Sequence, residues 1–412
     1  MMELQNLMAR YAHLVVESGL HLKKGQPLLI HALLETAPFV RLVVREAYEA
    51  GASRVEVAWR DEETARMDYT YQPLDNWQQV PAWQAALRND MAKAGGAILT
   101  IDAADPEALT GVDPRKSAAW AKAMHRDCKP YYDGMDKGEN IWCIIAAPSE
   151  KWAARIFPDL PVEEAVATLW QVIGKLMRLD AEDPSAAWEA HRRSFEERKA
   201  FLNGAQLDAL HFTSASTGTD LTVGLPQGYI WAGGGAELQD GTPFFPNMPT
   251  EEIFCSPHWE RTDGVVHSSL PLCHNGEMVE DFSFTFRDGK VVDYTARVGK
   301  EVLARLLETD EGAVRLGECA LIPKESPIAG TGLLFYNTLF DENAACHLAL
   351  GAGFSECLEG GLEMDDDQLK VHGVNCSAVH MDFMFGTPDL SVTGIRKDGT
   401  QVPIFRDGSW VI

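Results

Sequence analysis

Apolar and polar residues alternate in blocks along the first half of the chain, and these blocks predict a parallel sheet flanked by helices. Apolar residues at helical spacing mark helices at residues 3–19 and 38–50. Short apolar runs typical of buried strands lie at residues 28–32, 53–59, 97–101 and 140–146. Because a strand, a helix and a second strand within about 30 residues form a βαβ unit, we expect these strands to pair in parallel.

Two polar residues, His31 and Asp102, lie at the predicted ends of these strands. Both are candidates for a functional role, although a polar side chain that merely faces a loop is the commoner explanation. No G-x-G-x-x-G motif follows any of the strands, so the sequence gives dinucleotide binding no support.

A helical stretch over residues 150–200 follows, and the pattern changes near Gly204. Strand-like segments then dominate, at residues 207–212, 219–225, 281–286 and 290–297. A hairpin turn is expected between the last two of them. We therefore predict an α/β domain with a parallel sheet at residues 1–204, which includes the helical connector. An α+β domain with antiparallel pairing is predicted at residues 205–412.

The most informative stretch of the second half is Ser377–Phe385. Apolar residues surround His380 and Asp382, which predicts a buried strand. Since side chains on a strand alternate between its two faces, His380 and Asp382 point the same way. They need a partner or a metal ion, because burying a charged group alone is costly. A neutral histidine hydrogen-bonded to its neighbouring aspartate is the alternative.

Two glutamates stand in similarly unusual settings. Glu318 lies among the apolar residues of a predicted strand, where a lone carboxylate is rare, and a surface position is the alternative. Glu252 follows Thr250 and Glu251. The alternative there is the start of a helix, with Thr250 as its cap and both carboxylates near the positive end of the helix dipole.

Residues 337–351 supply two further candidates, Glu342 and His347. Asn343 is typical of a helix N-cap and Gly351 of a residue just past a helix end, which predicts a helix of about two turns around His347. Glu342 comes directly before the cap, so its carboxylate can turn toward the same space. A hydrogen-bonded core histidine is the alternative for His347.

Composition narrows the classes of partner. The net charge is -25, with 61 acidic and 36 basic residues, which argues against nucleic acid and anionic membranes. No run of about 18 apolar residues occurs, so no transmembrane helix is expected. The sequence begins without the basic start and apolar core of a signal peptide, and we therefore expect a cytoplasmic protein.

The eight cysteines are scattered, and none has C-x-x-C spacing. This disfavours a zinc ribbon or a dithiol redox site. Cys346 precedes His347, but neighbouring positions on a helix do not face each other, which disfavours a thiol nucleophile.

Several motifs spread over nearly the whole chain point to one family. They lie at residues 24–27, 47–52, 219–225, 247–252, 309–321, 341–351 and 380–384. Together they resemble the M29 metallo-aminopeptidases, the aminopeptidase T and aminopeptidase S group.

The resemblance implies a two-metal site and assigns its ligands. By position, the ligands of the family fall on Glu252, Glu318, His347, His380 and Asp382. Glu342 falls on an acidic position that we assign to the same metal site. The resemblance also implies a tyrosine seven residues after His347, where this chain has Phe354. A phenyl ring neither donates a hydrogen bond nor binds a metal, so this difference bears on activity and on the filling of one metal subsite.

Carboxylates and imidazoles suit zinc, cobalt, manganese or magnesium rather than a metal that prefers thiolates. Two such cations bridged by a carboxylate can acidify a water molecule and polarise a scissile carbonyl. Glu318 is the candidate bridge and catalytic residue, and the surrounding acids suit a substrate α-ammonium. The resemblance thus implies a metal-dependent aminopeptidase that acts on short peptides, with its metal site in the C-terminal domain. It also implies a homodimer.

Two alternative functions stay open. A mononuclear iron dioxygenase that cleaves aromatic rings has a related fold, and His347, His380 and Asp382 would suit iron(II). The presence of both Glu252 and Glu318 favours a second metal instead. A non-enzymatic relative would bind peptide or metal without turnover.

Overall fold

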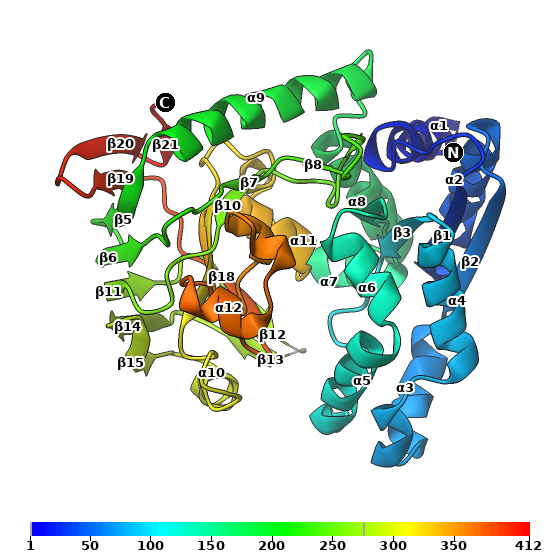
Figure 1. Cartoon of the computed structure of the whole chain (residues 1–412). Coiled ribbons are helices and arrows are strands. Elements are labelled where there is room, and N and C mark those ends of the chain that lie inside the picture. The colour runs from blue at the N-terminus through cyan, green and yellow to red at the C-terminus, as the bar shows by residue number, and fades with distance from the viewer. Residues whose placement is uncertain (1, 275–276) are drawn as a thin grey trace. The chain divides into compact units, whose positions relative to one another are not determined.

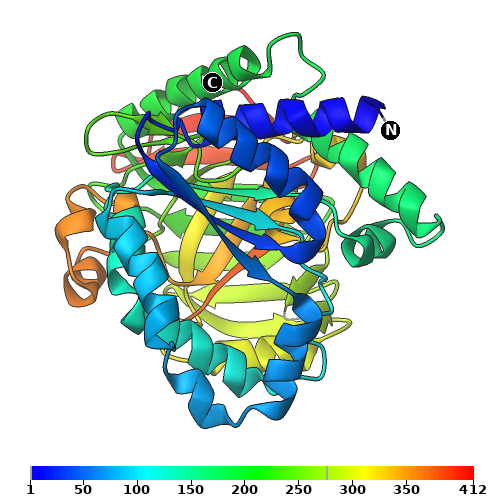
Figure 2. The same cartoon turned by 90° about the vertical axis from the view of Figure 1, so that its right-hand side faces the viewer.

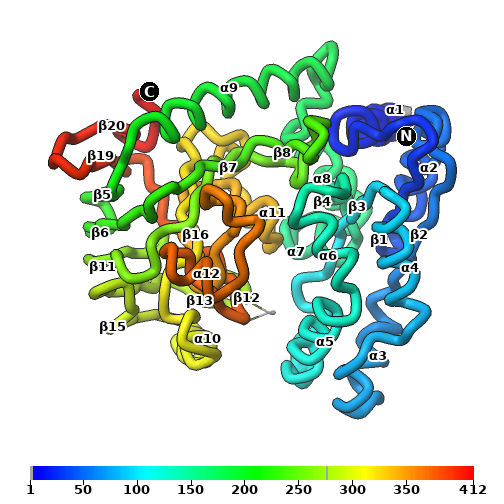
Figure 3. Tube along the Cα trace, in the orientation of Figure 1, coloured from blue at the N-terminus to red at the C-terminus, as the bar shows by residue number. Residues whose placement is uncertain are grey.

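The computed structural model describes residues 2–274 and 277–412. By contacts, the chain forms two compact units: Met1–Ala190 with Gly235–Pro249, and His191–Gly234 with Thr250–Ile412. The boundary between the two units therefore falls within helix α9 (Pro184–Gly204). Figure 3 shows that the trace of this helix is continuous. The predicted boundary lies at the end of the helix instead. The return of residues 235–249 to the first unit was not predicted either.

Helices and parallel strands alternate along the first unit (Figure 1). Its sheet contains β1 (Pro27–Leu33), β2 (Arg54–Arg60), β3 (Ala97–Asp102) and β4 (Trp142–Ala146). Before α9, its α-helices are α1 (Met2–Leu14), α2 (Ala37–Glu49), α3 (Glu62–Tyr71), α4 (Ala82–Lys93), α5 (Pro114–Asp127), α6 (Lys129–Asp136), α7 (Glu150–Ile156) and α8 (Val162–Leu176). Shorter elements are a π-helix (Val15–Gly19), 3-10 helices (Leu34–Thr36 and Leu74–Gln78), β8 (Ala236–Glu237) and β9 (Pro243–Phe244).

The four strands pair in the order β2-β1-β3-β4, and every pair is parallel, as predicted. The two central strands, β1 and β3, are almost continuously apolar and buried, which is typical of a parallel sheet covered on both faces. In Figure 2 the colours of the first unit run from blue through cyan to green. The returning segment, Gly235–Pro249, pairs with β4: Ile144 donates its N–H to Pro246 O over 2.7 Å, and Met248 donates to Ile144 O over 2.9 Å.

The second unit is built mainly from antiparallel strands. Its strands are β5 (Leu207–Ser214), β6 (Thr219–Gly224), β7 (Ala232–Gly233), β10 (Ile253–Cys255), β11 (Thr262–His267), β12 (Leu272–His274), β13 (Glu277–Val279), β14 (Ser283–Arg287), β15 (Lys290–Thr295), β16 (Leu316–Leu321), β17 (His347–Gly351), β18 (His380–Met384), β19 (Ser391–Arg396), β20 (Gln401–Arg406) and β21 (Ser409–Trp410). After α9, its α-helices are α10 (Lys300–Leu307), α11 (Thr338–Asp341) and α12 (Asp366–Val371). The described part of this unit also contains the 3-10 helices Ala329–Thr331, Glu342–Ala344, Ser355–Cys357 and Gly361–Glu363.

Two sheets of this unit enclose its core. One has eight strands in the order β15-β14-β11-β6-β5-β19-β20-β21, and the other has five in the order β18-β17-β16-β10-β7. Phe284 of the larger sheet packs edge-on against Phe383 of the smaller one, with ring centroids 5.1 Å apart. Both sheets contribute to one buried apolar cluster. The predicted antiparallel pairing is therefore confirmed.

The five-stranded sheet has one apolar face and one face that carries charged residues. Cys319, Leu348 and Phe383 belong to the apolar cluster. Because neighbouring strand residues face opposite sides, Glu318, His347 and Asp382 point away from that cluster. This polarity places the candidate residues on one surface of the sheet.

A β-bulge in β16 sets which face receives Glu318. Leu316 pairs with Leu350 and Glu318 pairs with Ala349, so Gly317 is the extra residue. The bulge lets Leu316 join the apolar cluster while Glu318 points to the opposite face. A Cβ atom at residue 317 would lie 2.0 Å from Ala352 O, so only glycine fits there.

The expectations about membrane-spanning helices and about cysteines can both be checked in the structure. Within residues 2–274 and 277–412, no helix has both the length and the apolar character needed to cross a membrane. All eight cysteines are free thiols, and six are buried. This burial agrees with the behaviour of cysteine as a small apolar residue.

His31 lies inside β1 rather than at its end, so the prediction of its position was wrong. The Nε2 atom of His31 is buried and has no hydrogen-bond partner among the described residues. The ring packs edge-on against Tyr131, with centroids 6.1 Å apart. Burial, aided by the charge of Arg88, lowers the pKa of His31 to about 4.

This lowered pKa predicts that acid weakens the first unit. In the unfolded chain a histidine takes up a proton near pH 6.5, whereas folded His31 does so only near pH 4. Stability is therefore lost as the pH falls between these values. We expect His31→Leu to flatten the dependence of the unfolding midpoint on pH in this range. Denaturant titrations at several pH values provide the measurement. His125→Gln, at an exposed histidine of the same unit, is the control. Equal slopes for wild type and His31→Leu would contradict the assignment.

Candidate metal centre

The candidate residues come from four segments that neighbour one another in the five-stranded sheet. Strand β16 carries Glu318, β17 begins with His347, and β18 carries His380 and Asp382. Glu252 lies directly before β10, the strand next to β16. Strand pairing thus gathers side chains from distant parts of the sequence onto one surface.

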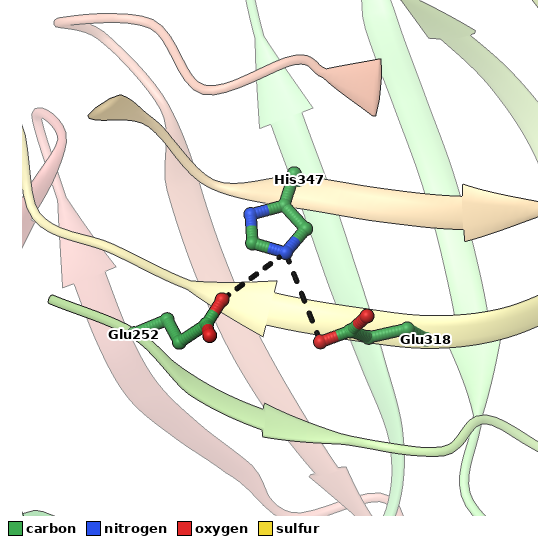
Figure 4. Close-up of side chains that lie close together, drawn as sticks. All are labelled: Glu252, Glu318 and His347. Atoms are coloured by element: carbon green, nitrogen blue, oxygen red, sulfur yellow. Dashed lines mark ion pairs between the residues drawn. The ribbon is translucent and has the colours of Figure 1, made fainter. Parts of the chain in front are cut away.

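His347 lies between two glutamates, as Figure 4 shows. Its Nε2 atom is 3.3 Å from Glu252 Oε2 and 3.7 Å from Glu318 Oε1. The exposed fractions of the side chains are 1% for His347, 8% for Glu252 and 5% for Glu318. One ligand atom from each lies within 4.8 Å of the other two, so a single metal ion can be held among them.

A second group shares Glu318 with the first. His380 Nε2 lies 3.1 Å from Glu318 Oε2 and 3.2 Å from Asp382 Oδ1. Ligand atoms of Glu318, His380 and Asp382 again lie within 4.8 Å of one another. The two oxygens of Glu318 thus face different imidazoles, and the structure brings five of the six predicted residues together.

Glu342 belongs to neither group but lies within electrostatic reach of both. It lines a cavity of about 40 Å³ together with Asp382. Burial raises the pKa of Glu342 well above its usual range, and the negative charges of Glu252 and Asp382 raise it further.

Within this cluster the ionisable groups depend strongly on one another. Burial raises the pKa of Glu252 to about 8, although His347 opposes the shift. Burial acts against ionised Glu318 too, but the neighbouring imidazoles of His347 and His380 outweigh it and lower its pKa to about 2. Burial likewise disfavours the protonated imidazoles. The negative charges of Glu318 and of nearby carboxylates nevertheless raise the pKa of His347 to about 10, and those of Asp382 and Glu318 raise the pKa of His380 to about 11. The imidazoles therefore hold protons when carboxylates are their only partners.

Backbone carbonyls orient both rings. His347 Nδ1 donates to Glu342 O over 2.8 Å, and His380 Nδ1 donates to Ala352 O over 2.8 Å. Each bond directs the other ring nitrogen, Nε2, at the carboxylates. Such a partner on the far nitrogen is typical of a metal-ligating histidine.

The residues fit a divalent cation. The donors are carboxylate oxygens and imidazole nitrogens, and the neighbouring thiols of Cys319 and Cys346 belong to the apolar cluster on the other face. Asp382 Oδ1 is buried and accepts no hydrogen bond from the described residues, although His380 lies beside it as an ion partner. A buried carboxylate oxygen without a donor is costly unless a cation binds it.

One local prediction about this site was wrong, and one alternative does not hold. His347 begins a strand rather than lying in a helix, because the helical turns of this segment end at Ala344 and Ala345 is already extended. Thr250 does not cap a helix, since β10 follows two residues after Glu251. Cys346 and His347 still point apart, but they do so as neighbours along an extended chain.

Phe354 lies against the site. Its ring centroid is 5.0 Å from that of His380 and 5.3 Å from that of Phe254. The position at which the resemblance implies a tyrosine is thus in contact with a candidate ligand.

Sequence reasoning missed the residues that support the ligands. Asn343 was interpreted only as a helix cap, yet it is fully buried and bonds to Glu251 and Glu342. Asn375 was not singled out, yet its amide donates to Gly351 O over 2.6 Å, next to the carbonyl that orients His380. A buried amide in an apolar stretch was the available signal, but it does not reveal its partners.

Comparison with known proteins identifies the family. The family model described as thermophilic metalloprotease (M29) matches residues 4–410. The chain belongs to the M29 family. The family is one of metalloproteases, which implies that this protein works with a divalent metal ion. Aminopeptidase T of Thermus thermophilus is 44% identical over 406 residues, 98% of each chain. Aminopeptidase AmpS of Bacillus subtilis is 41% identical over 400 residues, 97% of each.

A solved structure agrees with this M29 assignment. Wild-type AmpT from Thermus thermophilus matches with a TM-score of 0.91 and 42% identity, covering 99% of both chains. The resemblance inferred from the motifs is thereby confirmed. The iron dioxygenase and the non-enzymatic peptide-binding protein receive no support from these relatives.

The contact between Phe354 and His380 predicts that Phe354→Tyr changes catalysis more than stability. A hydroxyl added to this ring supplies a hydrogen-bond donor beside the candidate ligands. A well-oriented donor contributes on the order of 10²–10³ in rate. We expect kcat for peptide hydrolysis to rise, with a small change in melting temperature. Phe254→Tyr, which modifies the adjacent ring, is the matched control. An unchanged kcat together with unchanged metal content would show that the ring edge does not face the site.

Proposed function

We propose that this chain is a two-metal aminopeptidase that removes N-terminal residues from short peptides. The observation that carries the proposal is the position of Glu318, whose two oxygens serve the two ligand groups. Glu252 and His347 complete one group, and His380 and Asp382 complete the other. Zinc, cobalt, manganese and magnesium all accept such oxygen and nitrogen donors.

The ligand groups explain how the site would work. Divalent ions held by these residues would acidify a water molecule and polarise the scissile carbonyl. Glu318 is the proposed catalytic residue: it would hold the two groups in one arrangement and receive the proton of the attacking water. From Glu318 the proton would pass to the leaving nitrogen of the peptide. The rigid strand carrying Glu318 keeps its carboxylate oriented for this transfer.

The acidic surroundings explain the choice of the peptide N-terminus. Glu342 and Asp382 line the cavity of about 40 Å³ beside the ligand groups. Carboxylates in a poorly solvated place attract a substrate α-ammonium, and a blocked N-terminus lacks that charge. We include Glu342 in the site on this ground. A homodimer and a cytoplasmic location belong to the same proposal, and light scattering of the purified chain tests the first.

Removal of metal should abolish activity. We expect prolonged dialysis against EDTA to stop hydrolysis of aminoacyl chromogenic substrates, because the carboxylates and imidazoles then lack the ions that activate water. Cobalt, zinc or manganese should restore it. Elemental analysis of the same samples gives the metal content, and an N-acetylated substrate is the control that should not react. Full activity in a sample shown to be free of metal would exclude the proposal.

Substitution of the shared carboxylate should affect both metal groups. Glu318→Gln replaces two charged oxygens with one neutral oxygen, so we expect the content of both ions to fall and kcat to drop by at least about 10²-fold. Asp382→Asn changes only one group and is the matched control, for which we expect the loss of one ion. Circular dichroism reports whether each variant folds. A Glu318→Gln variant that keeps more than half of wild-type kcat would remove Glu318 from its proposed role.

A further inference from the structure

Asn343 is a completely buried polar side chain beside the candidate ligands. It lies in the 3-10 helix Glu342–Ala344 with an exposed fraction of 0%. Its Oδ1 atom accepts the backbone N–H of Glu251 over 2.7 Å. Its Nδ2 atom donates to Leu339 O over 3.0 Å and to Glu342 Oε1 over 3.4 Å. One amide therefore joins two segments that are far apart in the sequence.

These bonds lead directly to residues of the proposed site. Glu251 precedes Glu252, and both lie directly before β10. The bond to Asn343 therefore holds the backbone next to Glu252. On the other side, Glu342 accepts twice, because its carboxylate receives Asn343 Nδ2 and its carbonyl receives His347 Nδ1. The amide of Asn343 is thus linked to Glu342 directly, to His347 through the carbonyl of Glu342, and to Glu252 through the backbone of Glu251.

The backbone of Asn343 is itself fixed. Ser326, which is 2% exposed, donates its hydroxyl to Asn343 O over 2.7 Å. That hydroxyl also accepts the N–H of Ile328. Asn343 is therefore held by a second buried polar group, and its amide offers a fixed acceptor and a fixed donor in one plane.

We propose that Asn343 is a positioning residue of the metal centre, which sets the separation of Glu252 from Glu342 and His347. The inference rests on the proposed function, since it concerns the same site. Asn343 does not contact the reacting atoms. It acts by holding the ligands in the arrangement that binds metal, so that little ordering remains to be done when an ion binds.

Metal affinity tests this role separately from stability. Loss of a partner behind a ligand typically lowers metal affinity on the order of 10–100-fold. We expect Asn343→Ala to show such a loss in competition against a graded series of chelators, followed by elemental analysis. Because the ligands themselves remain, excess metal should recover much of the lost kcat.

The chain offers a matched control in Asn140. This asparagine of the first unit is 3% exposed, and its Nδ2 atom donates to Ala92 O and Gly96 O, each over 3.0 Å. Asn140→Ala removes comparable buried hydrogen bonds at a place without candidate ligands. We expect both alanine variants to melt at lower temperature, and only Asn343→Ala to lose metal affinity.

A second variant covers the case in which Asn343→Ala does not fold. Asn343→Leu keeps the volume of the side chain and removes only its hydrogen bonds. Wild-type metal affinity in either folded variant, measured well below its melting temperature, would overturn the inference. If the unmodified chain bound no metal or cleaved no peptide, the proposed function would fail instead, whatever the variants showed.

Discussion

Strand alternation in the five-stranded sheet is the constraint on which the site depends. One face must be apolar because it packs against the eight-stranded sheet, as the contact of Phe284 with Phe383 shows. Every intervening residue then faces the other way, and there the chain gathers carboxylates and imidazoles. Glu252, Glu318 and His347 are buried as deeply as many core residues. Since burial of one charge is costly, each is tolerated only because the others lie within reach.

A single inserted residue connects this constraint to the geometry of the ligands. The bulge at Gly317 reverses the facing of β16, so Leu316 and Glu318 occupy opposite faces. The absence of a side chain there also lets the backbone at Ala352 approach closely. That backbone supplies the carbonyl that orients His380. The shared carboxylate and one of the imidazoles therefore depend on the same glycine.

The sequence was sufficient for much of the architecture. Continuous apolar runs predicted the parallel strands, and the alternation around His380 and Asp382 predicted their common face, because both patterns follow directly from burial. The segment 342–351 was wrongly predicted as a helix because its helix-forming residues extend over only a few positions. Helical turns do form at Thr338–Ala344, and pairing of His347–Gly351 with β16 and β18 then overrides the helix expected from Gly351. The role of Asn343 was out of reach, since its bond to Glu251 spans 92 positions of sequence.

The same alternation places two kinds of metal ligand, thiols and oxygen or nitrogen donors, on opposite faces of one sheet. Cys319 follows Glu318 and Cys346 precedes His347, so soft thiols lie on the apolar face, directly behind the hard oxygen and nitrogen donors. A slip of one residue in strand register would exchange the two faces. The surface whose carboxylates now suit ions such as manganese or magnesium would then present thiols, which suit copper(I) or zinc. Discrimination between classes of metal is therefore encoded in the pairing of the backbone as much as in the identity of the ligands.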